Sequence, residues 1–246
     1  MSSKPVALIT GANKGIGFAI ARQLGERGYS VWLGCRDAGR GEKAAAELRS
    51  AGLDAHAITL DVADAQSVAA ARTRLESEVT ALDALVNNAG ISIGTNMRAS
   101  EESIDDMRLM FDVNTLGPMR VTQAFLPLLR RAEGARIVMV SSSLGSISET
   151  ADMSGLIWTV GYPGYSASKS ALNMLTVKLA KELLDEGIKV NAINPGYAAT
   201  DLNGHSGYRR VEDAAVAAVE LATLSPMGPT GGFFHDGHAQ QSRHGW

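Results

Sequence analysis

The chain has 246 residues, of which 45% are apolar and 20% charged, a composition that suits one α/β domain with a full core. Its net charge of -3 leaves no basic excess to hold a nucleic-acid backbone or an anionic membrane surface. The single cysteine, Cys35, excludes an internal disulfide, and no apolar run has the length of a signal peptide or of a membrane span, about 18 residues. We therefore expect one cytoplasmic domain over residues 1–246, with no nucleic-acid or membrane partner.

Short apolar runs alternate with longer helical patterns along the chain. The expected strands are Val6–Thr10, Ser30–Cys35, Ala55–Leu60, Ala84–Asn87, Arg136–Ser141, Lys189–Ile193 and Gly232–His235. The expected helices are Gly15–Arg27, Gly41–Ala51, Ala65–Thr80, Ser103–Arg131, Gly164–Asp185 and Val211–Thr223. This alternation predicts a doubly wound α/β domain, in which a mainly parallel sheet carries helices on both faces. Ligands of such folds bind beyond the carboxyl ends of the strands.

A glycine-rich turn follows the first expected strand, with Gly11, Gly15 and Gly17 in the spacing GxxxGxG. Gly11 lets the chain turn off the strand, and the other two glycines let backbone approach a diphosphate in front of the helix N–H groups. A glycine turn without a ligand is the alternative. The position between a strand and a helix favours a dinucleotide site.

Two further motifs follow in order. Asn87-Asn88-Ala89-Gly90 closes the fourth expected strand, and Tyr165-x-x-x-Lys169 opens a late helix. With the glycine turn, these motifs make the chain resemble the short-chain dehydrogenases/reductases from about Val6 to Asp236, and in particular carbonyl-reductase-like members. The resemblance implies a Rossmann-like domain with a parallel seven-stranded sheet. It also implies hydride transfer between a nicotinamide cofactor and a carbonyl or alcohol.

The end of the second expected strand bears on the choice of cofactor. An arginine there pairs with the 2′-phosphate of NADP, whereas an acidic residue selects NAD. Arg36 comes first, and Lys14 adds a second cation, so NADP(H) is expected and NAD(H) is the alternative. Asp37 could repel the phosphate, or Arg36 and Asp37 could form a solvated charge pair.

The third expected strand is followed by Asp61-Val62, which in similar proteins contacts the adenine. Asp61 could instead begin the next helix as its N-cap. By resemblance, Asn88, Ala89 and Gly90 let the cofactor lie against backbone.

Asn114 lies four residues before Pro118 inside the longest helical pattern. Pro118 has no N–H, so the Asn114 carbonyl loses its helical donor, and a kink with an inserted water is expected. In the family, the matching carbonyl holds a water that links the catalytic lysine to solvent. A proline kink without such a relay is the alternative.

The fifth expected strand ends in three serines, Ser141 to Ser143. The family's catalytic serine precedes a glycine by three positions, which selects Ser142, with Ser143 as the second choice. Its hydroxyl would donate a hydrogen bond to the substrate oxygen.

Tyr165 and Lys169 lie four residues apart and so share one face of the expected helix. A positive charge beside a phenol favours the phenolate, so we expect the pKa of Tyr165 to be lowered. By resemblance, Lys169 also holds the nicotinamide ribose. A surface tyrosine and lysine on an amphipathic helix is the alternative interpretation.

Two loops are expected to shape the substrate site. Residues 147–161 form an insertion before Tyr165, and residues 197–210 follow the sixth strand, with a mobile lid from Asn203 to Arg210. The candidate pocket walls, which could equally be ordinary packing, are Leu144, Trp158, Tyr197 and Tyr208. By resemblance, Pro195, Gly196, Ala198 and Thr200 lie near the nicotinamide. His235, His238 and His244 near Asp236 lack metal-ligand spacing, and no metal site is expected.

The sequence thus predicts reversible NADPH-dependent reduction of a ketone or aldehyde, with Tyr165 as general acid. An NAD-dependent alcohol dehydrogenase and a non-catalytic NADP(H) sensor are the alternatives, and a monomer and a homo-oligomer both stay open. The catalytic residues expected are Asn114, Ser142, Tyr165 and Lys169. The cofactor-binding residues expected are Gly11, Asn13, Lys14, Gly15, Ile16, Gly17, Arg36, Asp61, Val62, Asn88, Ala89, Gly90, Tyr165, Lys169, Pro195, Gly196, Ala198 and Thr200.

Overall fold

The computed structural model describes residues 4–94, 96–235 and 245–246. Within them, seven strands form one sheet in the order β3-β2-β1-β4-β5-β6-β7, and all neighbouring strands are parallel. The strands are β1 (Val6–Thr10), β2 (Ser30–Cys35), β3 (Ala55–Thr59), β4 (Ala84–Asn87), β5 (Arg136–Val140), β6 (Lys189–Asn194) and β7 (Phe233–His235). The predicted doubly wound, Rossmann-like fold is confirmed. The strand order reverses between β1 and β4, where folds of this kind open a crevice beyond the carboxyl ends of the strands.

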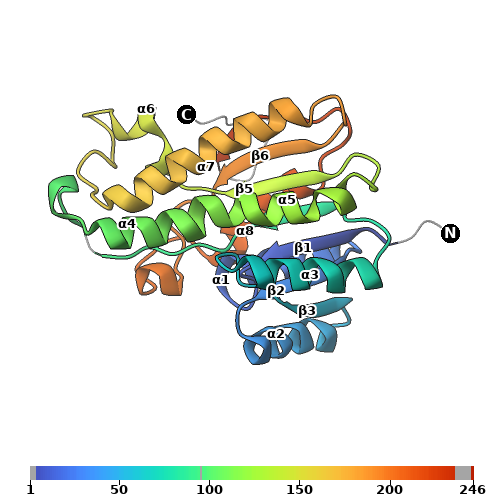
Figure 1. The fold of residues 1–246 in the computed structure, drawn as a ribbon. Coiled ribbons are helices and arrows are strands. Elements are labelled where there is room, and N and C mark those ends of the chain that lie inside the picture. The colour runs from blue at the N-terminus through green and yellow to red at the C-terminus, as the bar shows by residue number, and fades with distance from the viewer. Residues whose placement is uncertain (1–3, 95, 236–244) are drawn as a thin grey trace.

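Helices cover both faces of the sheet (Figure 1). The α-helices are α1 (Gly15–Glu26), α2 (Ala38–Ser50), α3 (Ala65–Glu78), α4 (Ile104–Phe111), α5 (Gly117–Leu129), α6 (Ile147–Thr150), α7 (Pro163–Glu182) and α8 (Val211–Ala222). Short 3-10 turns are η1 (Ala99–Glu101), η3 (Ser143–Gly145) and η4 (Asp201–Asn203), and η2 (Asp112–Leu116) is a π turn between α4 and α5.

The first strand shows how the core is divided. Ala7 and Ile9 pack with residues of α1, α2 and α8 on one face, whereas Leu8 packs with α3, α5 and α7 on the other. All five residues of β1 are buried. Because both faces are covered, the strand is apolar throughout rather than alternating, as in other parallel sheets. The sheet therefore holds its carboxyl ends rigidly at one edge, and the loops there build the site.

All six predicted helices differ from the structure by one to three residues at one or both ends, and two of these helices show a physical cause. The second begins at Ala38 rather than at Gly41, because the Asp37 side chain accepts the Arg40 N–H at 2.8 Å and caps it. The predicted Ser103–Arg131 helix is interrupted by η2, in which the Gly117 N–H donates to the Asp112 carbonyl, five residues back.

Candidate active site

The glycine turn after β1 is held by Asn88. Its Nδ2 donates to the carbonyls of Thr10 at 2.9 Å and Gly11 at 3.2 Å. Gly11 has φ +65°, and a Cβ on it would lie 3.0 Å from the Ala89 Cα, so only glycine fits this approach. A Cβ on Gly17 would lie 2.5 Å from the Asn88 Nδ2. The predicted glycines thus pack the start of α1 against the end of β4.

Thr10 is a member of this group that the sequence interpretation did not single out. Its Oγ1 accepts the N–H groups of Asn88 and Ala89, each at 3.0 Å. The threonine in the Thr-Gly pair was the available signal. It fixes the backbone on which the cofactor is expected to lie.

The start of α1 is open to an anion. Lys14, at the N-cap position, makes no side-chain cap hydrogen bond, and Gly15 follows with φ +59°. Helix N–H groups without such a cap are a ready anion site. Asn13 and Ile16, on either side of this start, are half-buried.

The two cations expected to bind a phosphate have different surroundings. Arg36 is exposed after β2, and the neighbouring Asp37 caps α2; among the described residues no ion pair joins the two, which was the alternative interpretation. Lys14 instead forms an ion pair with Asp201 on the loop after β6.

Asp61 is not the N-cap of α3. That position belongs to Asp64, whose side chain accepts the Gln66 N–H at 2.8 Å. Asp61 Oδ1 accepts the Ala63 N–H at 3.0 Å in the turn between β3 and α3. Val62 is buried against Gly117. The adenine contact expected at this pair stays a prediction.

Asn114 lies in η2 and is fully buried. Its side chain exchanges two hydrogen bonds of 2.8 Å with the backbone of Ile91 and donates to Ser168 Oγ at 3.1 Å. The chain accommodates Pro118 by widening the helix into a π turn. Because π turns are themselves common sites of helix kinks, the expected kink stays a prediction. The Asn114 side chain joins the loop after β4 to α7, and the expected water relay on its carbonyl stays a prediction.

Ser142 and Tyr165 are brought together by β5 and α7. Ser142 lies just beyond β5 and close enough to Tyr165 for its side chain to lower the pKa of the phenol. Ser141 points away from the tyrosine, because its Oγ donates to Asn173 Oδ1 at 2.6 Å. Among the three serines, Ser142 is the one whose side chain acts on the Tyr165 pKa, and its catalytic role stays a prediction.

The predicted lowering of the Tyr165 pKa is wrong for the protein without a ligand. Burial raises the pKa of Tyr165 to about 12, and the Ser142 hydrogen bond opposes this only in part. Lys169 is also buried, 3% exposed, and burial lowers its pKa to about 8. Its Nζ lies 5.7 Å from the Tyr165 ring centroid and donates to the Val140 carbonyl at 2.8 Å. Desolvation thus outweighs the attraction between the two groups.

A close packing contact sets the distance between β5 and α7. A Cβ on Gly145 would lie 2.8 Å from the Lys169 Cβ, so the turn after Ser142 lies directly on the helix. Asn173 Nδ2 and Ser170 Oγ both donate to the Gly145 carbonyl, at 3.0 and 2.9 Å. The sequence interpretation missed Asn173, whose only signal was a polar residue beside Leu172 on a buried helix face.

The loop after β6 is folded on itself. The Gly196 N–H donates to Asn194 Oδ1 at 3.0 Å, and the Ala199 N–H donates to the Arg209 carbonyl at 2.9 Å. Asn203 Nδ2 closes the loop by donating to the Ala198 carbonyl at 2.8 Å. The expected lid is therefore a compact turn with its own hydrogen bonds in this structure.

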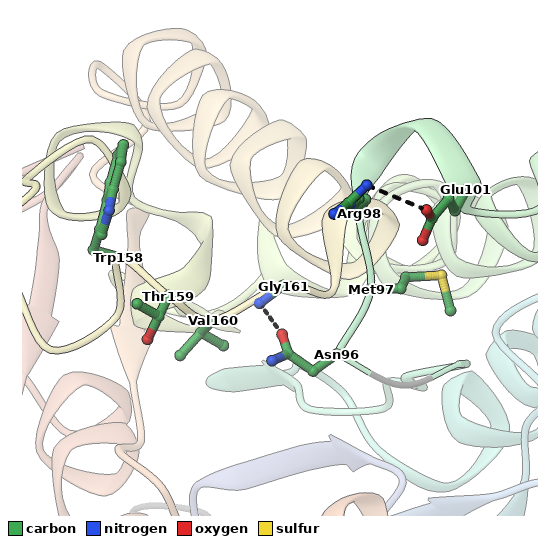
Figure 2. A pocket seen from close by; sticks show the side chains of 8 residues that line it. All are labelled: Asn96, Met97, Arg98, Glu101, Trp158, Thr159, Val160 and Gly161. Carbon is green, nitrogen blue, oxygen red and sulfur yellow. Dashed lines mark hydrogen bonds and ion pairs between the residues drawn. The ribbon is translucent and has the colours of Figure 1, made fainter.

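The candidate pocket walls fall into two groups. Tyr197 and Tyr208 face each other with ring centroids 6.1 Å apart, and Leu144 is half-buried in η3. Trp158, 47% exposed, lies at a hollow of about 450 Å³ between residues 96–101 and 158–161, and the Gly161 N–H donates to Asn96 Oδ1 there (Figure 2). Neither Tyr197 nor Tyr208 lines this hollow.

The described residues contain no group of three or more potential metal ligands. His235 Nδ1 is 3.0 Å from Asn194 Nδ2, while Asp236, His238 and His244 lie outside the described residues. No described helix is both long and apolar enough to cross a membrane.

Comparisons with known proteins agree with this fold. The family model described as short chain dehydrogenase matches residues 5–210. A short-chain dehydrogenase of Penicillium roqueforti is 37% identical, over 90% of this chain and 89% of that protein. The (-)-isopiperitenone reductase of Mentha piperita is 34% identical, over 93% and 95%. The solved structure of an NADPH-bound carbonyl reductase from chicken fatty liver superposes with a TM-score of 0.85 at 29% identity, covering 100% of both chains.

The parallel sheet and the family match together define a Rossmann-like oxidoreductase of the class that binds NAD(P)(H). More specifically, the chain belongs to the short-chain dehydrogenase family.

Proposed function

We propose that the protein reduces the carbonyl of a ketone or aldehyde with NADPH, reversibly. The observation that carries the proposal is the grouping of Ser142 and Tyr165 with the buried Lys169 ammonium, whose Nζ lies 5.7 Å from the Tyr165 ring centroid. Tyr165 donates its proton to the carbonyl oxygen, and Ser142 donates a hydrogen bond to the same oxygen. A pKa of about 12 keeps the Tyr165 phenol protonated near neutral pH, as a general acid in the reductive direction requires.

Lys169 serves two roles in this proposal. Its Nζ is held by the Val140 carbonyl, where it can bind ribose hydroxyls, and its pKa of about 8 lets it pass a proton toward Tyr165 near neutral pH. The Asn114 carbonyl, which lacks the N–H of Pro118, is proposed to hold the water that replaces that proton.

The glycine turn and its neighbours fit a nicotinamide dinucleotide. Gly90 lies beside the catalytic groups, since a Cβ there would be 3.5 Å from the Lys169 Nζ and 3.3 Å from Asn114 Oδ1. When bound, NADPH supplies the hydride that the carbonyl carbon receives. The residues proposed to hold it are Gly11, Asn13, Lys14, Gly15, Ile16, Gly17, Arg36, Asp61, Val62, Asn88, Ala89, Gly90, Tyr165, Lys169, Pro195, Gly196, Ala198 and Thr200.

A panel of ketones, aldehydes and quinones, mixed with NADPH or NADH and followed by absorbance, tests the activity. Tyr165→Phe should abolish turnover while NADPH binding survives, and normal turnover in this variant would exclude the mechanism. Arg36→Ala should raise the KM for NADPH, whereas Arg74→Ala, on the exposed face of α3, should leave it unchanged.

An NAD-dependent alcohol dehydrogenase is the second candidate. It is favoured by the ion pair in which Asp201 neutralises Lys14, one of the two cations expected at the phosphate. A higher kcat/KM with NADH than with NADPH would favour this candidate, and tight binding without turnover of any pair would favour a sensor.

A further inference from the structure

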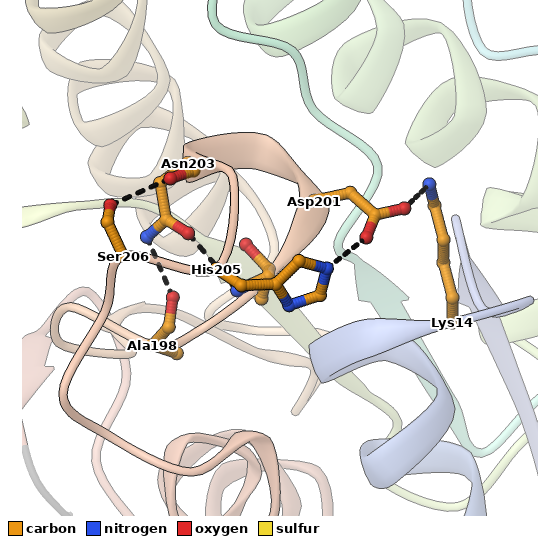
Figure 3. Close-up of polar contacts among 7 residues, drawn as sticks. Lys14, Ala198, Asp201, Asn203, His205 and Ser206 are labelled. Atoms are coloured by element: carbon orange, nitrogen blue, oxygen red, sulfur yellow. Dashed lines mark hydrogen bonds and ion pairs between the residues drawn. The ribbon is translucent and has the colours of Figure 1, made fainter.

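Three charged or polar side chains connect the glycine turn to the loop after β6. The Lys14 ammonium pairs with Asp201 Oδ2, and Asp201 Oδ1 lies 2.7 Å from His205 Nε2 (Figure 3). The Lys14 and Asp201 side chains are 55% and 50% exposed. An exposed pair of this kind is weak and is exchanged readily for a stronger partner.

The backbone below Asp201 is folded to present this carboxylate. Thr200 and Asn203 form a capping box around η4, and the His205 N–H donates to the Thr200 carbonyl at 2.9 Å. His205 itself has φ +61°, a left-handed conformation that costs a non-glycine residue free energy. The surrounding turn holds His205 in this conformation, which places its ring beside Asp201.

The same turn lies against the glycine turn. The Thr200 Cγ2 is 3.6 Å from the position that a Cβ on Gly15 would take. Lys14 and Asp201 therefore join the two walls of the groove in which the diphosphate of a dinucleotide is expected.

Both partners act on the charge of Asp201. Lys14 and, to a smaller extent, His205 lower the pKa of Asp201 below its usual range, so the residue is an anion at neutral pH. A 2′-phosphate carries about two negative charges at neutral pH, and it attracts Lys14 more strongly than one carboxylate does. NAD(H) carries no such phosphate and leaves the Lys14–Asp201 pair without a competitor.

We propose that Asp201 is an internal competitor of the 2′-phosphate for Lys14, and so a residue that sets the preference between NADP(H) and NAD(H). The proposal rests on the proposed use of Lys14 in NADPH binding. Binding of NADP(H) displaces Asp201 and releases the turn 200–205 from the glycine turn, whereas NAD(H) leaves the turn in place. The loop that borders the substrate site thus responds to the identity of the dinucleotide.

The test is a binding experiment that needs no turnover. Dissociation constants of 2′,5′-ADP, 5′-AMP, NADPH and NADH are measured by calorimetry for the unchanged protein, Asp201→Asn, Lys14→Met and the double variant. Asp105→Asn is the matched control, because Asp105 is an exposed carboxylate paired with Arg108 on α4, away from the groove. Asp201→Asn should bind NADPH and 2′,5′-ADP about 5-fold more tightly and NADH unchanged. In the Lys14→Met background the same substitution should have no effect.

The outcomes separate this proposal from the proposed function. If the unchanged protein binds 2′,5′-ADP no better than 5′-AMP, both the NADPH assignment and the competitor role are wrong. If it prefers 2′,5′-ADP but Asp201→Asn leaves the preference unchanged or weakens NADPH binding, only the competitor role is wrong.

Hydrogen exchange gives a second readout. The amides of Asn203 and His205 donate to the Thr200 carbonyl. Saturating 2′,5′-ADP should speed their exchange, and 5′-AMP should not. Slower exchange with 2′,5′-ADP would mean that the phosphate tightens the turn, and would overturn the release of the loop.

Discussion

The start of α7 and the turn 200–205 border the same proposed site but are stabilised in opposite ways. Tyr165 and Lys169 are buried, and close packing fixes them against the end of β5. Asp201 and His205 are at least half exposed, and an ion pair and a strained turn hold them. Burial shifts the pKa values of the first pair by desolvation, whereas the Asp201 pKa is lowered by its contacts with Lys14 and His205.

This difference suits the two regions to different functions. A proton donor must be held to a fraction of an ångström, and a packed interface achieves this. A contact that yields to a ligand must instead be weak and exposed. The following predictions therefore change packing in the first region and charge or backbone strain in the second.

The largest effect is expected from Gly145→Ala. Its Cβ would lie 2.8 Å from the Lys169 Cβ and 2.9 Å from the Lys169 backbone carbon, so η3 and α7 must separate. A displacement near 1 Å should lower kcat/KM for carbonyl reduction by about 10²-fold. Gly39→Ala, which meets only Asp37 Oδ1 at 3.4 Å, is the control and should retain activity. Unchanged kinetics in Gly145→Ala would show that this contact does not position Ser142.

A smaller effect is expected from Asn173→Ala. It removes the acceptor of the buried Ser141 Oγ at a cost of about 1–3 kcal/mol, and it removes one of the two side-chain donors to the Gly145 carbonyl. Because Asn173 acts through the turn that carries Ser142, kcat should fall about tenfold with the KM for NADPH unchanged. Thr176→Val removes a buried hydroxyl that bonds only within α7 and should cost stability without lowering kcat. Equal kinetics in the two variants would remove the positioning role of Asn173.

The sequence was sufficient for the architecture because its signals there are local. Val6–Thr10 is apolar and ends in a glycine turn, and its bounds in the structure are those predicted. The Ser142–Tyr165 pairing was also predictable from motif order. Asn173 and Gly145 were not, since their roles depend on which surfaces meet after folding. The Tyr165 pKa was predicted in the wrong direction because desolvation is a property of the whole packed environment.

Asp37 and Pro118 show a second kind of miss. Both were recognised as unusual, but the local structure that each one causes has more than one solution. Asp37 caps α2 and so extends that helix to Ala38, and the helix widens into a π turn just before Pro118. The choice between such solutions depends on the neighbouring elements.

The pH dependence of stability tests the buried ammonium. The pKa of Lys169 is lowered from 10.5 to about 8 on folding, so the unfolded chain binds more protons between these values and stability should rise with pH there. Lys169→Met removes the buried charge and should raise the free energy of unfolding near pH 7 by on the order of 1–3 kcal/mol. This difference in the free energy of unfolding between Lys169→Met and the unchanged protein should disappear by about pH 10. Urea unfolding of both proteins at several pH values measures it, and a constant difference from pH 7 to pH 10 would contradict it.

Tyr165 provides the opposite sign in the same measurement. Its pKa is raised from 10.0 to about 12 on folding, so the native state binds more protons between these values, and stability should fall as pH rises through them. Tyr165→Phe should abolish this fall while leaving the rise caused by Lys169 in place.

The smallest effect is expected from His205→Gly. Glycine adopts φ +61° without steric cost, which favours folding, but the contact with Asp201 Oδ1 is lost and the unfolded chain gains conformational entropy. These contributions nearly cancel, so the free energy of unfolding should change by less than about 0.5 kcal/mol. His205→Ala loses the same contact and keeps the strain, so it should be less stable than His205→Gly, by up to about 1 kcal/mol. Equal stability of the two variants by urea unfolding would show that the turn relaxes when the imidazole is removed. If His205→Gly is more stable than His205→Ala, the neighbouring hydrogen bonds impose the strained backbone at this position. A turn that is released by a ligand requires such imposed strain.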